Sequence, residues 1–171
     1  MVQAFIAEQL FDGEQLHKNV ALTVDRGRVV SLGGTPAADA VRLQGLLAPG
    51  LIDIQVNGGG GALFNNDTSV NALGKMSAAH ARFGTTGFMP TLITDQVEVM
   101  QKAADAVSAA LREGVPGVLG VHFEGPHLSA PKKGTHEECF IRPLSEEELA
   151  IYAREDLGLK MVTLAPENVS P

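Results

Sequence analysis

The chain has 171 residues, 44% hydrophobic and 19% charged, which allows one domain with a sizeable core or a small domain plus part of a larger one. Its net charge of −7 argues against nucleic-acid binding, which usually requires a basic surface. One cysteine cannot form an internal disulfide, and neither a signal peptide nor an apolar run of membrane-spanning length is present, so we expect a soluble cytoplasmic protein without nucleic-acid or membrane partners.

Residues 1–48 predict a small antiparallel sheet domain of the β-sandwich type. Short apolar runs alternate there with glycine-containing turns, a pattern typical of strands joined by hairpins. The runs read "AFIAEQLF", "NVALTV", "VVSLGG" and "AVRLQGLL".

From Pro49 onward the pattern changes to longer apolar segments separated by helical spacing. Strands that are apolar almost throughout are typical of a sheet buried on both faces. The predicted strands are residues 50–56, 85–93, 117–124 and 160–166.

Three helices are expected between these strands. Asp95 with Glu98, and Ser145 with Glu148, have the spacing of capping boxes that begin the second and third helices, the third running through Tyr152. The first helix is expected over 69–83. The residues expected to face inward are Met76, Ala79 and Phe83 in the first helix, and Val97, Met100, Ala104, Val107 and Leu111 in the second.

Alternation of strands and helices predicts right-handed parallel βαβ units. Four such units are half of a (β/α)8 TIM barrel, which typically needs about 250 residues. A complete open α/β sheet remains an alternative. Because the sequence stops after a fourth strand and before its helix, we expect residues 49–171 to be the first four βα units of an incomplete barrel.

The carboxyl ends of the predicted strands carry polar side chains, and chemistry gathers at these ends in both kinds of sheet. Since side chains alternate along a strand, Asp53, Gln55 and Asn57 share one face, as do His122 and Glu124. Polar groups that point into an apolar interior are costly unless they are paired or bind a ligand.

Each of these residues also has a structural interpretation. Glu124 is either a metal-binding or catalytic carboxylate or a buried group satisfied within the protein. His122 is more simply structural, supporting a neighbouring ligand, and His127 could merely line the pocket. Lys132 and Lys133 are either solvated loop charges or the attraction for one anionic ligand.

The order and spacing of four blocks resemble a known family. "APGLIDIQVNGGGG", "GTTGFMPTLIT", "GVHFEGPHLSAPKKGTH" and "VTLAPE" are similar to successive blocks of the N-acetylglucosamine-6-phosphate deacetylases, members of the amidohydrolase superfamily. The resemblance runs from about Pro49 to the end and covers the N-terminal part of such an enzyme. The block "HFEGPHL" with the downstream "KKGTH" is its most specific part.

The resemblance implies roles for particular residues. Glu124 matches the glutamate that binds one divalent metal ion, zinc in the first instance and iron or cobalt otherwise. Gln55 matches the position that helps hold the metal-bound water, and the Gln55-x-Asn57 pattern indicates a mononuclear site. Thr135, His136 and Asn57 are the expected substrate-binding residues, and Lys132 and Lys133 are candidates for the phosphate side together with His136. Two histidine ligands and the aspartate that acts as general base and acid are expected beyond residue 171, so no catalytic residue is assigned within the chain.

The implied reaction is metal-dependent hydrolysis of N-acetylglucosamine 6-phosphate to glucosamine 6-phosphate and acetate, in amino-sugar catabolism, by an enzyme expected to form homodimers. Two alternatives remain at this point. One is another amidohydrolase that acts on a cyclic amide or a different N-acyl amine, which a substrate panel would distinguish. The other is a non-catalytic binding or assembly module, which would have no hydrolase activity and weak metal affinity.

Overall fold

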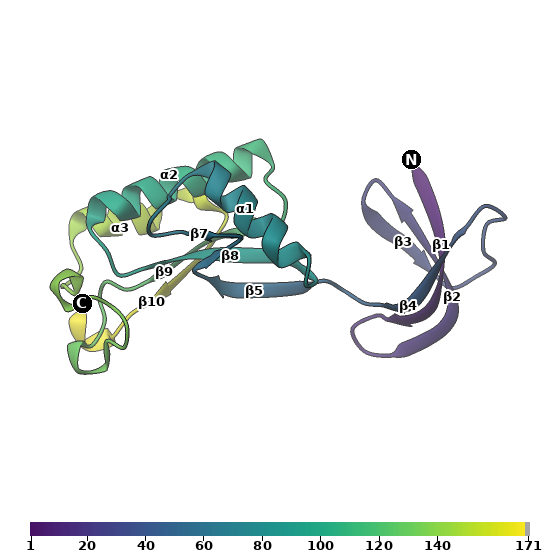
Figure 1. The fold of residues 1–171 in the computed structure, drawn as a ribbon, viewed down its shortest axis with the longest axis horizontal. Helices are drawn as coiled ribbons and strands as arrows, with labels where there is room; N and C mark the ends of the chain where they lie inside the picture. Colours follow the sequence, from purple (N-terminus) through teal and green to yellow (C-terminus); the bar gives the residue numbers. More distant parts are fainter. Residues whose placement is uncertain (170–171) are drawn as a thin grey trace. The chain divides into compact units, whose positions relative to one another are not determined.

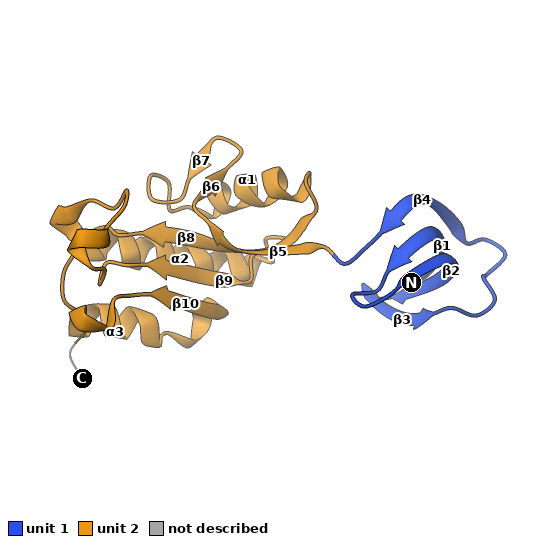
Figure 2. Cartoon of the chain, turned by 90° about the horizontal axis from the view of Figure 1, so that it is seen from below, with its two compact units in different colours: residues 1–49 blue, residues 50–171 orange. Residues whose placement is uncertain are grey.

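The structure, a computed structural model, describes residues 1–169. Two compact units divide the chain between Pro49 and Gly50 (Figure 2). Each unit has its own sheet and its own apolar core, so each is described separately.

The first unit is a four-stranded sheet with the strand order β3-β2-β1-β4. The strands are β1 (Val2–Phe11), β2 (Leu16–Asp25), β3 (Arg28–Leu32) and β4 (Val41–Leu47). Hairpin-linked β1, β2 and β3 are antiparallel as expected, but β4 pairs in parallel with β1, so the expectation of a wholly antiparallel sheet is wrong. The segment between β3 and β4 is longer than a tight turn, which allows the chain to cross to the other edge of the sheet.

The second unit is built on a parallel sheet with the strand order β10-β9-β8-β5. Its strands are β5 (Leu51–Val56), β8 (Thr85–Ile93), β9 (Gly120–Glu124) and β10 (Leu159–Thr163). A small two-stranded ribbon, β6 (Gly58–Gly59) with β7 (Ala62–Leu63), follows β5. The four predicted strands are therefore confirmed, and together with the first unit they make a mixed α/β fold.

Helices α1 (Val70–Ala81), α2 (Val97–Glu113) and α3 (Glu146–Ala153) all lie on one face of the parallel sheet (Figure 1). Among the described residues, single turns of 3₁₀ helix occur at Ala130–Lys132, Glu138–Phe140, Glu155–Leu157 and, after β10, Pro166–Asn168. Within residues 1–169, none of the helices combines the length and apolar character needed to cross a bilayer.

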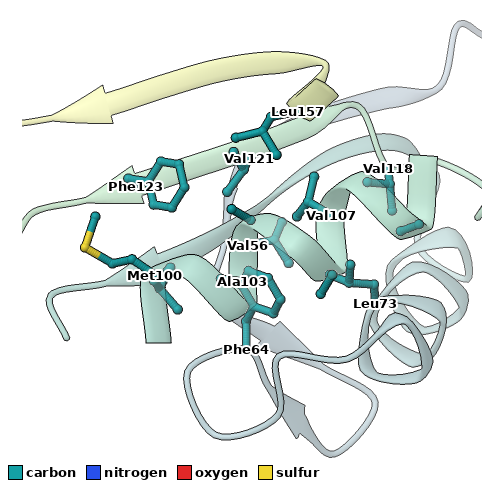
Figure 3. Close-up of a cluster of buried hydrophobic side chains, with 14 of the residues drawn as sticks. Val56, Phe64, Leu73, Met100, Ala103, Val107, Val118, Val121, Phe123 and Leu157 are labelled. Carbon is teal, nitrogen blue, oxygen red and sulfur yellow. The ribbon is translucent and has the colours of Figure 1, made fainter. Parts of the chain in front are cut away.

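The core of the second unit fills the space between the sheet and its helices (Figure 3). Phe123 and Val121 point from β9 toward Met100 and Val107 of α2, and all four are at most 1% exposed. Burial of one such side chain contributes about 1.5–3 kcal/mol. Because alternate residues of β9, Val121 and Phe123, enter this core, His122 and Glu124 lie on the opposite face of the sheet.

The helix boundaries correct two expectations. Phe83 is 82% exposed and lies beyond α1, which ends with Arg82 as its C-cap, so it does not face the core. Asp95 does not cap α2, whose N-cap is Gln96 without a side-chain hydrogen bond. The Ser145–Glu148 capping box at the start of α3 is confirmed, since both of its reciprocal hydrogen bonds are present.

Candidate active site

A pocket of about 290 Å³ lies at the carboxyl ends of the parallel strands, and we call it the strand-end pocket. It contains groups from β5, from the ends of β8 and β9, and from the long loop after β9. Its lining residues are Gln55, Asn57, Leu63, Asn65, Ile93, Glu124, Thr135 and His136.

The structure thus brings together the residues that the sequence assigned to metal, water and substrate. Gln55 and Asn57 come from β5, Glu124 from β9, and Thr135 and His136 from the loop. The strand ends are neighbours because β5, β8 and β9 are parallel and adjacent. This is the juxtaposition that the alternation pattern predicts for carboxyl strand ends.

His122 lies beside the pocket rather than in its wall. Its Nδ1 is 3.2 Å from the Thr91 hydroxyl and its Nε2 is 2.8 Å from the Thr163 hydroxyl, so both ring nitrogens have partners on neighbouring strands. Burial lowers the pKa of His122, and the nearby Glu124 carboxylate partly opposes that shift. His122 is therefore held between β8 and β10 through its two ring nitrogens, two residues before Glu124.

His127 and the two lysines are placed away from the strand-end pocket. His127 is fully buried, with Nδ1 donating to the Arg142 carbonyl at 2.9 Å and Nε2 lying 3.2 Å from the Tyr152 hydroxyl. Lys133 is 3.7 Å from Glu138, and neither Lys132 nor Lys133 lines the pocket. Their assignment to the phosphate side has no contact in the structure to support it.

One polar atom in the pocket wall stands out. The Asn57 amide nitrogen is buried and has no hydrogen-bond partner within residues 1–169. A buried donor without a partner costs about 1–3 kcal/mol. Its position in the pocket wall suits a hydrogen bond to a bound water or substrate oxygen.

The described residues do not by themselves form a complete metal site. No group of three or more His, Cys, Asp and Glu side chains between residues 1 and 169 is arranged to hold a metal ion. Glu124 is nevertheless suited as one ligand, because its carboxylate reaches the pocket with its side chain 20% exposed. The amides of Gln55 and Asn57 are poor zinc ligands and good hydrogen-bonding groups, so the donor set fits one carboxylate ligand beside a hydrogen-bonded water.

Asn65 also lines the strand-end pocket, although the sequence does not indicate it as a site residue. Its amide oxygen accepts from the Ile93 N–H at 3.0 Å, while its amide nitrogen donates to the Ile93 carbonyl at 3.1 Å and to Asp95 at 2.8 Å. It therefore fastens the glycine-rich segment after β5 to the end of β8. Nothing in the sequence distinguishes Asn65 from the adjacent Asn66.

A second pocket, of about 410 Å³, lies within the first unit. Its walls are mainly apolar, formed by Leu10, Phe11, Asp12, Leu22, Val29, Leu32, Leu47, Ala48 and Pro49. Asp12 is the one charged residue among these, and this pocket lacks the group of polar side chains that lines the strand-end pocket.

Comparison with known proteins relates this chain to one group of enzymes. No protein-family model matches the chain. An N-acetylgalactosamine-6-phosphate deacetylase of Shewanella sp. (strain ANA-3) is 47% identical over 163 residues, which are 91% of this chain and 41% of that protein. The chain resembles part of an amino-sugar 6-phosphate deacetylase.

Other amino-sugar phosphate deacetylases match a shorter part of the chain or match it at lower identity. The human N-acetylglucosamine-6-phosphate deacetylase is 39% identical over 131 residues, 71% of this chain and 31% of that protein. A crystal structure of N-acetylglucosamine-6-phosphate deacetylase from Pasteurella multocida has a TM-score of 0.90 at 34% identity, covering 98% of this chain and 46% of that chain. The chain thus spans less than half the length of these deacetylases.

Proposed function

We propose that the full-length gene product removes the acetyl group from N-acetylglucosamine 6-phosphate, giving glucosamine 6-phosphate and acetate. The observation that carries this proposal is the strand-end pocket, in which Glu124 meets Gln55, Asn57, Thr135 and His136. The similarity to a deacetylase extends over 91% of the chain, which supports the proposal.

The roles follow from the chemistry of each group. Glu124 would hold a divalent metal ion, which when bound polarises an acyl carbonyl and lowers the pKa of water. Gln55 and Asn57 would orient the attacking water through their amides, and the buried Asn57 nitrogen would gain the partner it lacks. Thr135 and His136 would contact the sugar phosphate from the loop after β9.

Further metal ligands and the group that transfers the proton would come from residues outside 1–169. We also infer that the parallel sheet is the first half of a (β/α)8 barrel, with residues 49–171 as four βα units beside a small β domain of residues 1–48. Both β5 and β10 have one unpaired edge within the described residues, where further strands could add. Zinc is the metal we expect first, and we expect a cytoplasmic homodimer, which light scattering would test.

N-Acetylgalactosamine 6-phosphate is a second candidate substrate. The Shewanella relative that carries this activity in its name is 47% identical, against 39% for the human glucosamine-phosphate enzyme. The two sugars differ in the configuration of one hydroxyl group. Measuring both substrates side by side therefore belongs to the first experiment.

The test is acetate release by the full-length, metal-loaded protein from each N-acetylhexosamine 6-phosphate. We expect Glu124→Gln to lower kcat/KM by more than about 100-fold, because loss of a ligand should exceed the usual effect of losing a group that supports one. Chelation should abolish activity and added zinc should restore it. N-Acetylglucosamine without phosphate is the control substrate, and equal turnover of it would argue against a phosphate-specific site.

A further inference from the structure

Thr94, the residue directly after β8, contacts His136 and Glu124, two residues that line the strand-end pocket. Its hydroxyl is 2.8 Å from Nδ1 of His136 and 3.3 Å from the Glu124 carbonyl oxygen. Its backbone nitrogen is 3.4 Å from the same Nδ1. Thr94 is 4% exposed, so both of its polar groups depend on partners inside the protein.

Two hydrogen-bond arrangements are possible around His136. In the first, Nδ1 carries no proton and accepts from both the N–H and the hydroxyl of Thr94. In the second, Nδ1–H donates to the hydroxyl, which donates in turn to the Glu124 carbonyl. Since a hydroxyl has only one proton, the two arrangements exclude each other.

The backbone amide of Thr94 favours the first arrangement. An amide N–H can only donate, and in the second arrangement it would point at a protonated nitrogen and lose its partner. A buried amide left without an acceptor is disfavoured by about 1–3 kcal/mol. The amide therefore favours an unprotonated Nδ1.

The opposite side of the ring gives an independent argument. Nε2 of His136 is 3.7 Å from Oε1 of Glu124. In the first arrangement Nε2 carries the proton, and the partial positive charge of this N–H faces the negative carboxylate. In the second, an unprotonated nitrogen would face the oxygen lone pairs, which is unfavourable.

We propose that Thr94 is a positioning residue that holds His136 in the Nε2–H form, so that His136 donates a hydrogen bond to an oxygen of the bound substrate and is not a metal ligand. The substrate half of this statement rests on the proposed function. The assignment of the tautomer does not, because it follows from Thr94 and Glu124 alone. A nitrogen that carries a proton has no lone pair for a metal.

The direct test is ¹⁵N NMR of the histidine side chains in the full-length protein, with and without zinc, at mildly alkaline pH where free imidazole is neutral. The His136 signals are assigned by their loss in His136→Asn. We expect Nδ1 to give the shift of an unprotonated nitrogen and Nε2 that of a protonated one in both samples. A protonated Nδ1, or an Nε2 signal that shifts to a metal-bound value with zinc, would overturn the proposal.

Two variants test the part played by Thr94 itself. Thr94→Val keeps the shape and the backbone amide but removes the hydroxyl, whereas Thr94→Ser keeps the hydroxyl. Because the amide and Glu124 remain, we expect Thr94→Val to keep the Nε2–H tautomer but to move the Nδ1 signal toward that of an unprotonated nitrogen with a weaker hydrogen bond, and to lower kcat/KM about tenfold since the ring loses its 2.8 Å contact. We expect Thr94→Ser to keep the parental signals with most of the activity. Thr85→Val, at the other end of β8, is the matched control and should change neither readout.

The outcomes separate this proposal from the proposed function. If no acetate is released but the expected tautomer is present and its Nδ1 signal moves in Thr94→Val, the deacetylase fails and the positioning role stands. If acetate is released while Thr94→Val and Thr94→Ser give identical spectra and rates, Thr94 does not position His136 and the proposal is wrong.

Discussion

At the scale of single residues, the buried carboxylate of Glu148 connects several segments of the second unit. It is fully buried and accepts from Arg142 Nε at 2.7 Å and from the N–H and hydroxyl of Ser145 at 2.9 and 2.8 Å. Arg142 in turn donates to the carbonyls of Asp95 and Phe140. The loop after β9 is thereby held against α3 and the start of α2.

We expect Glu148→Gln to lower the free energy of unfolding of the full-length protein by about 3 kcal/mol. The neutral amide leaves the Arg142 guanidinium without its buried counter-charge, and removal of one partner of a buried pair typically costs about 3–5 kcal/mol. Urea unfolding monitored by circular dichroism measures the change. Glu147→Gln, at the neighbouring exposed position, is the control and should stay within about 0.5 kcal/mol of the parent; equal effects would show that the pair is not stabilising.

The sequence identified most pocket residues because they lie at strand ends with alternating direction. That rule indicated Gln55, Asn57 and Glu124, but it also indicated Asp53 and His122, which do not line the pocket, and the roles came from the family resemblance. The contribution of Thr94 depends on a distance of 2.8 Å to His136, which is 42 residues away, and no local pattern encodes that distance. Asn65 was missed for the same reason, since its partners are at the end of another strand.

At the scale of elements, local signals located the helices but not all of their ends. Ser145 begins α3 as predicted because its partner Glu148 lies within the same turn. Asp95 has the same spacing to Glu98, yet its carboxylate instead accepts from the Gln96 N–H at 2.8 Å and from Asn65 at 2.8 Å. The Asp95 side chain is thus engaged in a tertiary hydrogen bond with Asn65 and does not form the cap of α2 that the sequence pattern predicts.

Two glycines in helical segments should respond in opposite directions to alanine. Gly114 is the C-cap of α2 with φ 70°, a left-handed conformation, whereas Gly74 lies inside α1, and an added Cβ meets no atom within 4 Å at either position. We expect Gly114→Ala to destabilise by about 1–2 kcal/mol and Gly74→Ala to stabilise by about 0.5–1 kcal/mol. Thermal unfolding of both variants beside the parent measures the difference, and each serves as the other's control. Shifts of the same sign would contradict the assignment of backbone strain.

At the scale of the whole molecule, the edge strand β5 carries apolar side chains that the described residues leave exposed. Leu51, Ile52 and Ile54 are all more than half exposed. An unpaired edge with such side chains is prone to association. If further strands complete a barrel, these side chains become covered in the full-length protein.

The substitution Ile54→Lys distinguishes a β5 whose apolar side chains stay exposed from a β5 that further strands cover. In the chain of residues 1–171 alone we expect this substitution to reduce self-association, measured by light scattering, because it places a charge on the exposed edge. In the full-length protein we expect the same substitution to lower the free energy of unfolding by more than about 2 kcal/mol, because it would bury a charge.

Ala78→Lys, on the exposed side of α1, is the matched control and should affect neither measurement. A full-length protein indifferent to Ile54→Lys would show that β5 stays uncovered and would argue against a closed barrel.

The guanidinium of Arg142 has a consequence for how this chain can change over generations. It donates to two carbonyls and one carboxylate at once, and a lysine ammonium cannot reproduce that planar geometry. Substitution of Arg142 is therefore destabilising while Glu148 remains charged, and substitution of Glu148 is destabilising while Arg142 remains. Among descendants of a common ancestor we expect the two positions to change together or not at all, and an alignment deep enough to contain both states would reveal this coupling.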